Sequence, residues 1–223
     1  KSMISVIDES LAFSLKQYAL MAEVMKGKPD LLPRTIDASG ALVTSNSEWW
    51  TSGFFPGSLW YLYDYSNDNK FKDAAIQMTS RIEKEKNNTG THDLGFMLYC
   101  SFGNGLRLTD DKSYNDVLLT GARSLSTRFR PNIGCIQSWG SRKGWQCPVI
   151  IDNMMNLEFL MWAFNQTGDS SFYKIAVTHS DTTIKNHFRT DYSTWHVVSY
   201  DTITGKVEAK QTAQGATDGS AWS

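Results

Sequence analysis

The feature that most constrains this chain is a turn sequence that occurs three times. The pattern is Ser/Thr-x-Asp-x-x-aromatic, and its copies span residues 66–71, 109–114 and 167–172. An apolar residue follows the aromatic by four positions in each copy (Ala75, Leu118 and Ala176). The Asp can cap the helix that follows, and the aromatic can pack against its first turn. Each copy therefore predicts a short connection between two antiparallel helices.

Apolar periodicity predicts helices on both sides of these turns. Apolar residues recur at steps of three and four from Ile4 to Met25, and Gly27, Pro29 and Pro33 end that helix. A second helix begins near Pro56. The other helical patterns cover 71–84, 93–107, 114–129, 152–166 and 172–187. Repeated helical hairpins of this kind predict an all-α solenoid or a closed α/α toroid.

The remaining connections, 85–92, 130–151 and 188–218, are long. Short and long connections alternate, and alternate connections between antiparallel helices lie at opposite ends of a fold. All long loops are therefore expected at one end, where function tends to concentrate. The last loop also predicts a β-hairpin, because residues 195–200 alternate in polarity and residues 201–205 form a turn sequence.

Composition excludes several classes of protein. Of the 223 residues, 22 are Lys or Arg and 23 are Asp or Glu, so no basic surplus points to nucleic acid. No apolar run approaches the ~18 residues of a membrane span. The three cysteines show no metal-binding spacing, although a Cys135–Cys147 disulfide stays open. The sequence has no P-loop, G-x-G-x-x-G or G-x-S-x-G motif, so nucleotide binding and serine hydrolysis have no support.

The long-loop end would gather two carboxylates, Asp93 and Asp152, with His92, His196 and several tryptophans. Each has a structural alternative: the aspartates could cap helices, the histidines could be satisfied core residues, and the tryptophans could be core. His92, Asp93 and His196 include no pair at helical i, i+4 spacing, so we expect no metal and no cofactor.

Four stretches in series run through nearly the whole chain. They are Trp49–Trp60 (WWTSGFFPGSLW), Thr91–Met97 (THDLGFM), Ile151–Leu157 (IDNMMNL), and Thr212–Gly215 (TAQG) with Ser220–Trp222 (SAW). Together they resemble the unsaturated glucuronyl hydrolases, glycoside hydrolase family 88. The resemblance implies an (α/α)6 barrel and a bacterial enzyme that degrades glycosaminoglycans or similar polysaccharides after a lyase has acted.

The resemblance also implies roles for particular residues. Asp152 corresponds to the general acid/base, and Asp93 corresponds to the aspartate that assists it. The substrate is an oligosaccharide with a 4,5-unsaturated uronic acid at its non-reducing end. Its binding positions correspond to Trp50, Phe54, His92, Trp139, His196 and Gln214.

Two carboxyl groups suit the hydration of this sugar. The ring contains an enol ether, so protonation at C4 creates an oxocarbenium-like cation at C5 that water can attack. The acid must hold its proton near neutral pH, whereas an ordinary Asp has a pKa of about 3.9. We therefore predict that burial and the charge of Asp93 raise the pKa of Asp152, against the opposing effect of a helix N-terminus.

The chain departs from the family in length. Seven helices are predicted where the family barrel has twelve, and the sequence stops where the family continues with an Arg-Gly-Gln segment. We expect residues 1–223 to be the N-terminal portion of a single barrel domain, with exposed apolar faces on its first and last helices. Self-association or a completing C-terminal segment would cover these faces. The expected location is bacterial, either periplasmic after removal of a signal or cytoplasmic.

Three alternatives stay open at this point. The first is an unsaturated rhamnogalacturonyl hydrolase or another (α/α)6 carbohydrate-active enzyme. The second is a non-catalytic glycan-binding helical repeat, which would tolerate the loss of both aspartates. The third is an inverting glycosidase that uses Asp93 and Asp152 on saturated sugars.

Overall fold

The computed structural model describes residues 1–142, 144–214 and 217–220. The chain folds into two compact units, one formed by Lys1–Lys86 with Phe96–Leu118 and the other by Asn87–Gly95 with Leu119–Ser223. The described residues form seven α-helices together with short strands, which agrees with the predicted helical class. None of the helices in this described part has the length and apolar character needed to cross a membrane.

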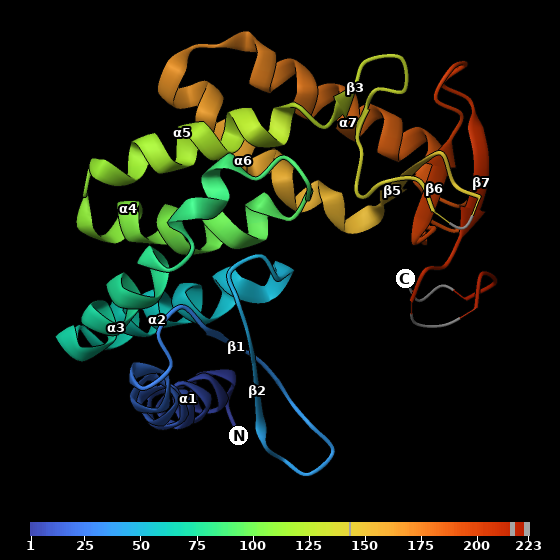
Figure 1. The fold of residues 1–223 in the computed structure, drawn as a ribbon. Coiled ribbons are helices and arrows are strands. Elements are labelled where there is room, and N and C mark those ends of the chain that lie inside the picture. The colour runs from blue at the N-terminus through green and yellow to red at the C-terminus, as the bar shows by residue number, and fades with distance from the viewer. Residues whose placement is uncertain (143, 215–216, 221–223) are drawn as a thin grey trace. The chain divides into compact units, whose positions relative to one another are not determined.

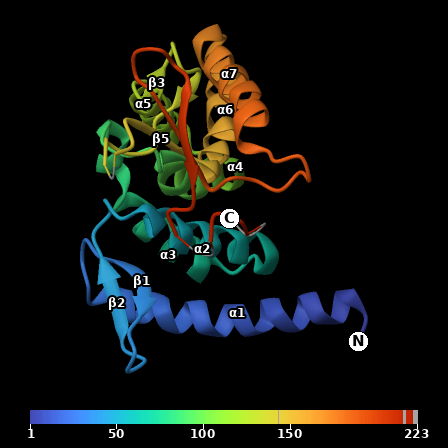
Figure 2. The same ribbon diagram turned by 90° about the vertical axis from the view of Figure 1, so that its right-hand side faces the viewer.

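The first unit is built mainly from helices (Figures 1 and 2). The helix α1 (Met3–Lys26) precedes an antiparallel hairpin of β1 (Leu32–Ile36) and β2 (Leu42–Ser45). The elements that follow are a 3-10 turn (Trp50–Gly53), α2 (Phe54–Ser66), α3 (Asn69–Ser80), a second 3-10 turn (Glu83–Asn87), a π-helix (Gly95–Gly103), α4 (Asn104–Thr109) and the start of α5 (Ser113–Ser126). The helices α2 and α3 lie side by side as one hairpin.

The second unit joins helices to a small sheet. It contains the rest of α5, β3 (Phe129–Arg130), β4 (Cys135–Ile136), β5 (Cys147–Ile150), a 3-10 turn (Ile151–Met155), α6 (Asn156–Thr167), α7 (Ser170–His187), β6 (Val197–Tyr200) and β7 (Val207–Gln211). The sheet has the order β5-β6-β7, and all its neighbours are antiparallel. The helices α6 and α7 form a hairpin that is visible in both views (Figures 1 and 2).

The three repeated turns have the predicted structure. The helix before each turn ends on a residue in the left-handed region, Asn67, Asp110 or Gly168. Each repeated hydroxyl (Ser66, Thr109, Thr167) donates to the carbonyl four residues back and accepts the N–H of the repeated Asp. Each Asp then accepts a backbone N–H at the start of the next helix (Asp68, Asp111, Asp169). The repeat therefore encodes both the stop of one helix and the start of the next.

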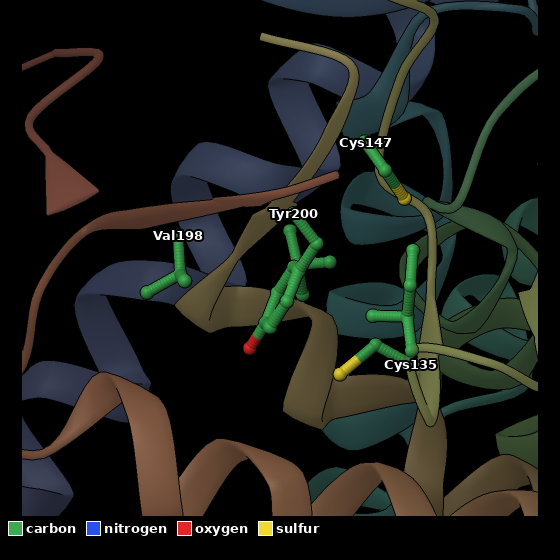
Figure 3. Packing of buried hydrophobic residues seen from close by; sticks show 6 residues of the cluster. Cys135, Cys147, Val198 and Tyr200 are labelled. Carbon is green, nitrogen blue, oxygen red and sulfur yellow. The ribbon is translucent and has the colours of Figure 1, made fainter. Parts of the chain in front are cut away.

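A packed cluster beside the sheet forms part of the core of the second unit. It consists of Ile133, Cys135, Cys147, Val149, Val198 and Tyr200. Figure 3 shows the Tyr200 ring between Val198 and the two cysteines. The two cysteines are free thiols, so the disulfide left open by the sequence does not form. Burial raises the pKa of Cys135 to about 12 and that of Cys147 to about 11, which makes both poor nucleophiles.

Several elements differ from the predictions. The segment expected as a helix over 93–107 is a π-helix followed by α4. Its long apolar run offers no polar face, so residue periodicity does not distinguish an α-helix from a π-helix there. The β1–β2 hairpin was not predicted, although Asp37 and Gly40 carry its turn. The predicted hairpin at 195–205 is confirmed, but β6 is buried on both faces, because Val198 and Tyr200 pack into one buried cluster and Val197 packs into another.

Apolar side chains are exposed on the first and the last helix, as expected. On α1 they include Met3, Ile4, Phe13 and Leu20, and on α7 they include Tyr173 and Ile184. Exposed apolar surface of this extent is typical of interaction surfaces. Self-association or coverage by a completing segment stays a prediction.

Gly53 leaves no room for a side chain. A Cβ at this position would lie 2.0 Å from the carbonyl oxygen of Phe96 and 2.5 Å from that of Met97. We expect Gly53→Ala to lower the free energy of unfolding by about 3 kcal/mol or more, because backbone would have to move. Gly27→Ala is the matched control, since its nearest neighbour would be 3.9 Å away. Equal midpoints in urea for the two variants would contradict this expectation.

Candidate active site

Asp93 is held by the short loop that precedes the π-helix. Its Oδ2 accepts the hydroxyl of Thr91 at 2.6 Å, and its own N–H donates to the Thr91 Oγ1 at 3.1 Å. Its Oδ1 lies 3.4 Å from His92 Nε2, and 18% of its side chain is exposed. The carboxylate therefore bonds to a loop hydroxyl and does not cap the helix that follows.

Two buried asparagines attach this loop to α6. Asn156 Oδ1 accepts the N–H of Gly95 at 3.0 Å, and Asn156 Nδ2 donates to the carbonyl of His92 at 2.8 Å. The same Nδ2 donates to Asn153 Oδ1 at 2.7 Å, while Asn153 Nδ2 donates to the carbonyl of Ile136 at 2.6 Å. Both asparagine side chains are fully buried. These bonds bring the residues on each side of Asp93 onto the start of α6.

Asp152 lies in the 3-10 turn directly after β5. The N–H of the preceding Ile151 donates to the carbonyl of His196 at 2.9 Å, which extends the β5–β6 pairing up to the residue before Asp152. The Asp152 Oδ1 is buried and has no hydrogen-bond partner among the described residues. The helix α6 starts only at Asn156, so Asp152 is not its cap. The capping alternative is therefore wrong for Asp152.

Burial, as the larger cause, and the negative charge of Asp93, as the smaller one, together raise the pKa of Asp152 to about 6. The predicted direction is confirmed, and the two carboxyl groups lie within electrostatic range of each other. Both predicted causes act, and burial is the larger of the two. The reason is that no donor reaches the buried Oδ1 to stabilise the charged form.

The two histidines beside the aspartates are neutral. Burial lowers the pKa of His92, although Asp93 partly opposes this effect. Burial also lowers the pKa of His196. The His196 Nδ1 accepts the backbone N–H groups of Ala213 and Gln214 at 3.1 and 3.3 Å, which places the ring proton on Nε2. Gln214 therefore reaches the site through its backbone, and its side chain is exposed.

Trp139 forms an aromatic wall next to these groups. Its ring centroid lies 6.4 Å from that of His92 and 6.3 Å from that of Trp145. It packs against the buried cluster of Trp145, Ile150 and Val197. Its indole nitrogen is buried without a hydrogen-bond partner in the described part of the chain. We call His92, Asp93, Trp139, Asp152 and His196 the site cluster.

The other two predicted binding residues, Trp50 and Phe54, belong to the first unit. Their rings lie 5.6 Å apart, and both contact Phe96. They are 40% and 36% exposed, which leaves surface for a ligand. Their binding role stays a prediction. Gly215, Ala221 and Trp222 of the fourth resembling stretch lie outside the described residues.

Sequence reasoning missed three residues around the site cluster. Asn156 was part of a resembling stretch, but nothing in the pattern showed that it bonds to the loop of Asp93. Arg128 is buried and donates to the carbonyls of Thr89, Gln137 and Ser138. Arg142 lies with its guanidinium carbon 4.3 Å from the centre of the Trp139 ring. No grouping of three His, Cys, Asp or Glu that could bind a metal occurs among the residues that the structure describes.

Comparisons with known proteins show what the whole chain is similar to. No family model matches the chain. It is 47% identical over 175 residues to an unsaturated glucuronyl hydrolase of Formosa agariphila, covering 78% of this chain and 44% of that protein. It is 33% identical over 185 residues to an unsaturated chondroitin disaccharide hydrolase of Streptococcus pneumoniae, covering 81% of this chain and 46% of that protein.

A solved structure shows the same fold. The crystal structure of an unsaturated glucuronyl hydrolase specific for heparin superposes with a TM-score of 0.89 at 44% identity. The match covers 96% of this chain and 58% of that one. The fold is thus that of the α/α-barrel hydrolases. The chain spans about half the length of the curated relatives it matches.

Proposed function

Because the chain belongs to the unsaturated glucuronyl hydrolases, we propose that it removes a 4,5-unsaturated uronic acid from the non-reducing end of lyase-generated oligosaccharides. The observation that carries this proposal is the pKa of Asp152, which burial and Asp93 raise to about 6. A carboxyl group with such a pKa can hold a proton near neutral pH and can accept one again after giving it away.

The reaction begins with transfer of the Asp152 proton to C4 of the sugar. The π electrons of the C4–C5 double bond form the new C–H bond, and the ring oxygen stabilises the resulting cation at C5. Water then attacks C5 and loses a proton to the Asp152 carboxylate, which restores the acid. The product is a hemiketal. It opens to a ketone at C5 and leaves a hemiacetal at C1, which collapses and releases the second sugar.

The neighbours of Asp152 have separate tasks in this scheme. Asp93 keeps a negative charge near the developing cation and favours the protonated form of Asp152 before the reaction. Neutral His196 can donate from Nε2 to a sugar oxygen or to the carboxylate of the uronate. The buried polar atoms without partners, on His92 and Trp139, are further candidates for contact with the ring. Desolvation of the cluster strengthens each of these interactions.

Glycosaminoglycan disaccharides are the proposed substrate class. Two relatives are described by their action, one as specific for heparin and one as a chondroitin disaccharide hydrolase. The test is a panel of lyase-generated unsaturated disaccharides from chondroitin, heparin and rhamnogalacturonan, followed by loss of the enol-ether ultraviolet absorbance. We expect turnover of a glycosaminoglycan disaccharide. Its saturated counterpart lacks this absorbance, so its cleavage is followed by release of reducing sugar, and we expect none. Cleavage of the saturated sugar would favour an inverting glycosidase, and binding without turnover would favour a glycan-binding repeat.

The pH dependence follows from the raised pKa of Asp152. The acid is active when protonated, so kcat/KM is expected to fall as pH rises through about 6, by about tenfold per pH unit. In Asp93→Asn the smaller of the two causes is removed, so this alkaline limb should move to lower pH. The measurement is a pH profile of kcat/KM for both proteins. An unmoved limb in Asp93→Asn would show that Asp93 does not act on the acid.

A further inference from the structure

Arg142 occupies a tight turn that is anchored to the sheet beside the site cluster. Its N–H donates to the carbonyl of Trp145 at 3.2 Å, and the N–H of Trp145 donates back at 2.9 Å. Gly144 has a φ of +78°, which this turn requires and glycine adopts without strain. The indole N–H of Trp145 donates to Gln211 on β7 at 3.0 Å. The backbone of Arg142 is therefore held in place.

The side chain of Arg142 is also positioned, by stacking. Its guanidinium carbon lies 4.3 Å from the centre of the Trp139 ring, and Trp139 contacts His92 of the site cluster. A sugar that approaches this face of Trp139 meets a cation before it meets the ring. Stacking leaves the N–H groups at the edge of the guanidinium free to bind an anion.

Two other arginines of the same unit donate from their side chains to hydrogen-bond acceptors, whereas the Arg142 guanidinium does not among the described residues. Arg189 stacks on Trp195 at 4.2 Å, and it also donates to the hydroxyl of Ser193 and to two backbone carbonyls. Arg128 donates to three backbone carbonyls. Arg142 is exposed, and within the described ranges its guanidinium has neither a hydrogen-bond acceptor nor a carboxylate at ion-pair distance. Its five donors are thus available to a ligand.

We propose that Arg142 binds an anionic group, sulfate or carboxylate, of the unsaturated oligosaccharide. This inference rests on the proposed function, because it assigns a partner to a cation beside the same site. Sulfate and carboxylate both present oxygens that match the guanidinium fork. Since Trp139 already orients the guanidinium, little conformational freedom is lost when the anion binds.

The test compares Arg142→Met with the unchanged protein on a matched pair of unsaturated disaccharides that differ by one sulfate. Methionine keeps an apolar contact with Trp139 and removes the charge. We expect KM to rise about tenfold, with kcat changed less than about threefold, since one charge-assisted hydrogen bond is lost. A rise for the sulfated sugar alone identifies sulfate as the anion, and an equal rise for both identifies the uronate carboxylate.

Two control variants test whether the effect is specific to the guanidinium of Arg142. Arg123→Ala removes an exposed arginine from α5 and should leave both KM values unchanged. Arg142→Lys should recover part of the affinity, because the charge returns without the fork. Unchanged KM for both sugars in Arg142→Met, or a fall in kcat alone, would overturn the inference. If the unchanged protein turns over neither sugar, the proposed function itself has failed.

Discussion

Asp152→Asn is expected to reduce kcat/KM by roughly a thousandfold or more, within the range that general acid–base catalysis contributes. An amide cannot transfer a proton to C4 or take one from the attacking water. The measurement is loss of the ultraviolet absorbance of an unsaturated disaccharide. Asp181→Asn is the matched control. Asp181 is exposed on α7 of the same unit, so this substitution should leave kcat/KM unchanged.

The same substitution should make the protein more stable, which separates a chemical effect from a folding defect. The pKa of Asp152 is about 6 in the folded protein against 3.8 for the free group, so the folded state binds the proton more tightly. Protonated Asp152 therefore adds its full contribution to the free energy of unfolding below pH 4, and this contribution is lost as pH rises through 6. At pH 8 we expect Asp152→Asn to raise the free energy of unfolding by roughly 2–3 kcal/mol, the cost of ionising the buried group.

The outcomes of this experiment are distinct. Loss of turnover with raised stability at pH 8, and little change in stability at pH 4, is the expected combination. Retained turnover would remove Asp152 from the role of acid. Loss of both turnover and stability would contradict this expectation. It would mean that the Asp152 carboxylate stabilises the fold, although its Oδ1 has no hydrogen-bond partner among the described residues.

Asn156→Asp is expected to destabilise the fold strongly. The Oδ1 can still accept the N–H of Gly95, but the Nδ2 that donates to His92 and Asn153 becomes an oxygen. The carbonyl of His92 and the Oδ1 of Asn153, both acceptors, would then face a buried carboxylate. We expect the free energy of unfolding at pH 8 to fall by about 3–5 kcal/mol, as for an uncompensated buried charge.

Activity should fall with it, because the loop that carries Asp93 loses its attachment to α6. The matched control is Asn132→Asp, since Asn132 makes one exposed hydrogen bond to Thr202 and its loss should cost about 1 kcal/mol. Chemical unfolding and turnover are measured for both variants. Equal effects from the two exchanges would show that Asn156 does not hold the site.

Much of the fold could be predicted because its determinants are local. The turn after Ser66 needs only a hydroxyl, a residue tolerant of the left-handed region and a capping Asp within a few positions. The same holds for the hairpin closed by Asp201 and Gly205, where Asp201 Oδ1 accepts N–H groups two and three residues ahead. Hydrogen bonds between residues only two to four positions apart can be predicted from the sequence alone.

The site could be predicted only in part. The resemblance of four stretches pointed to Asp93 and Asp152, and the structure brings both into one unit with His92, His196 and Trp139. The attachment of the loop through Asn156 was not predicted, because its partners lie 61 and 64 positions away. Arg142 was missed for a similar reason, since its importance depends on what Trp139 contacts.

By itself, the sequence determined the turns that join the helices and the helical class of the fold, because capping and periodicity act over short distances, and the resemblance of four stretches named the two candidate carboxylates. Only the tertiary structure decided that burial, more than the second carboxylate, raises the pKa of Asp152, and that β6 is covered on both faces. Desolvation depends on which atoms surround a group. Those atoms come from distant parts of the chain that only folding brings together.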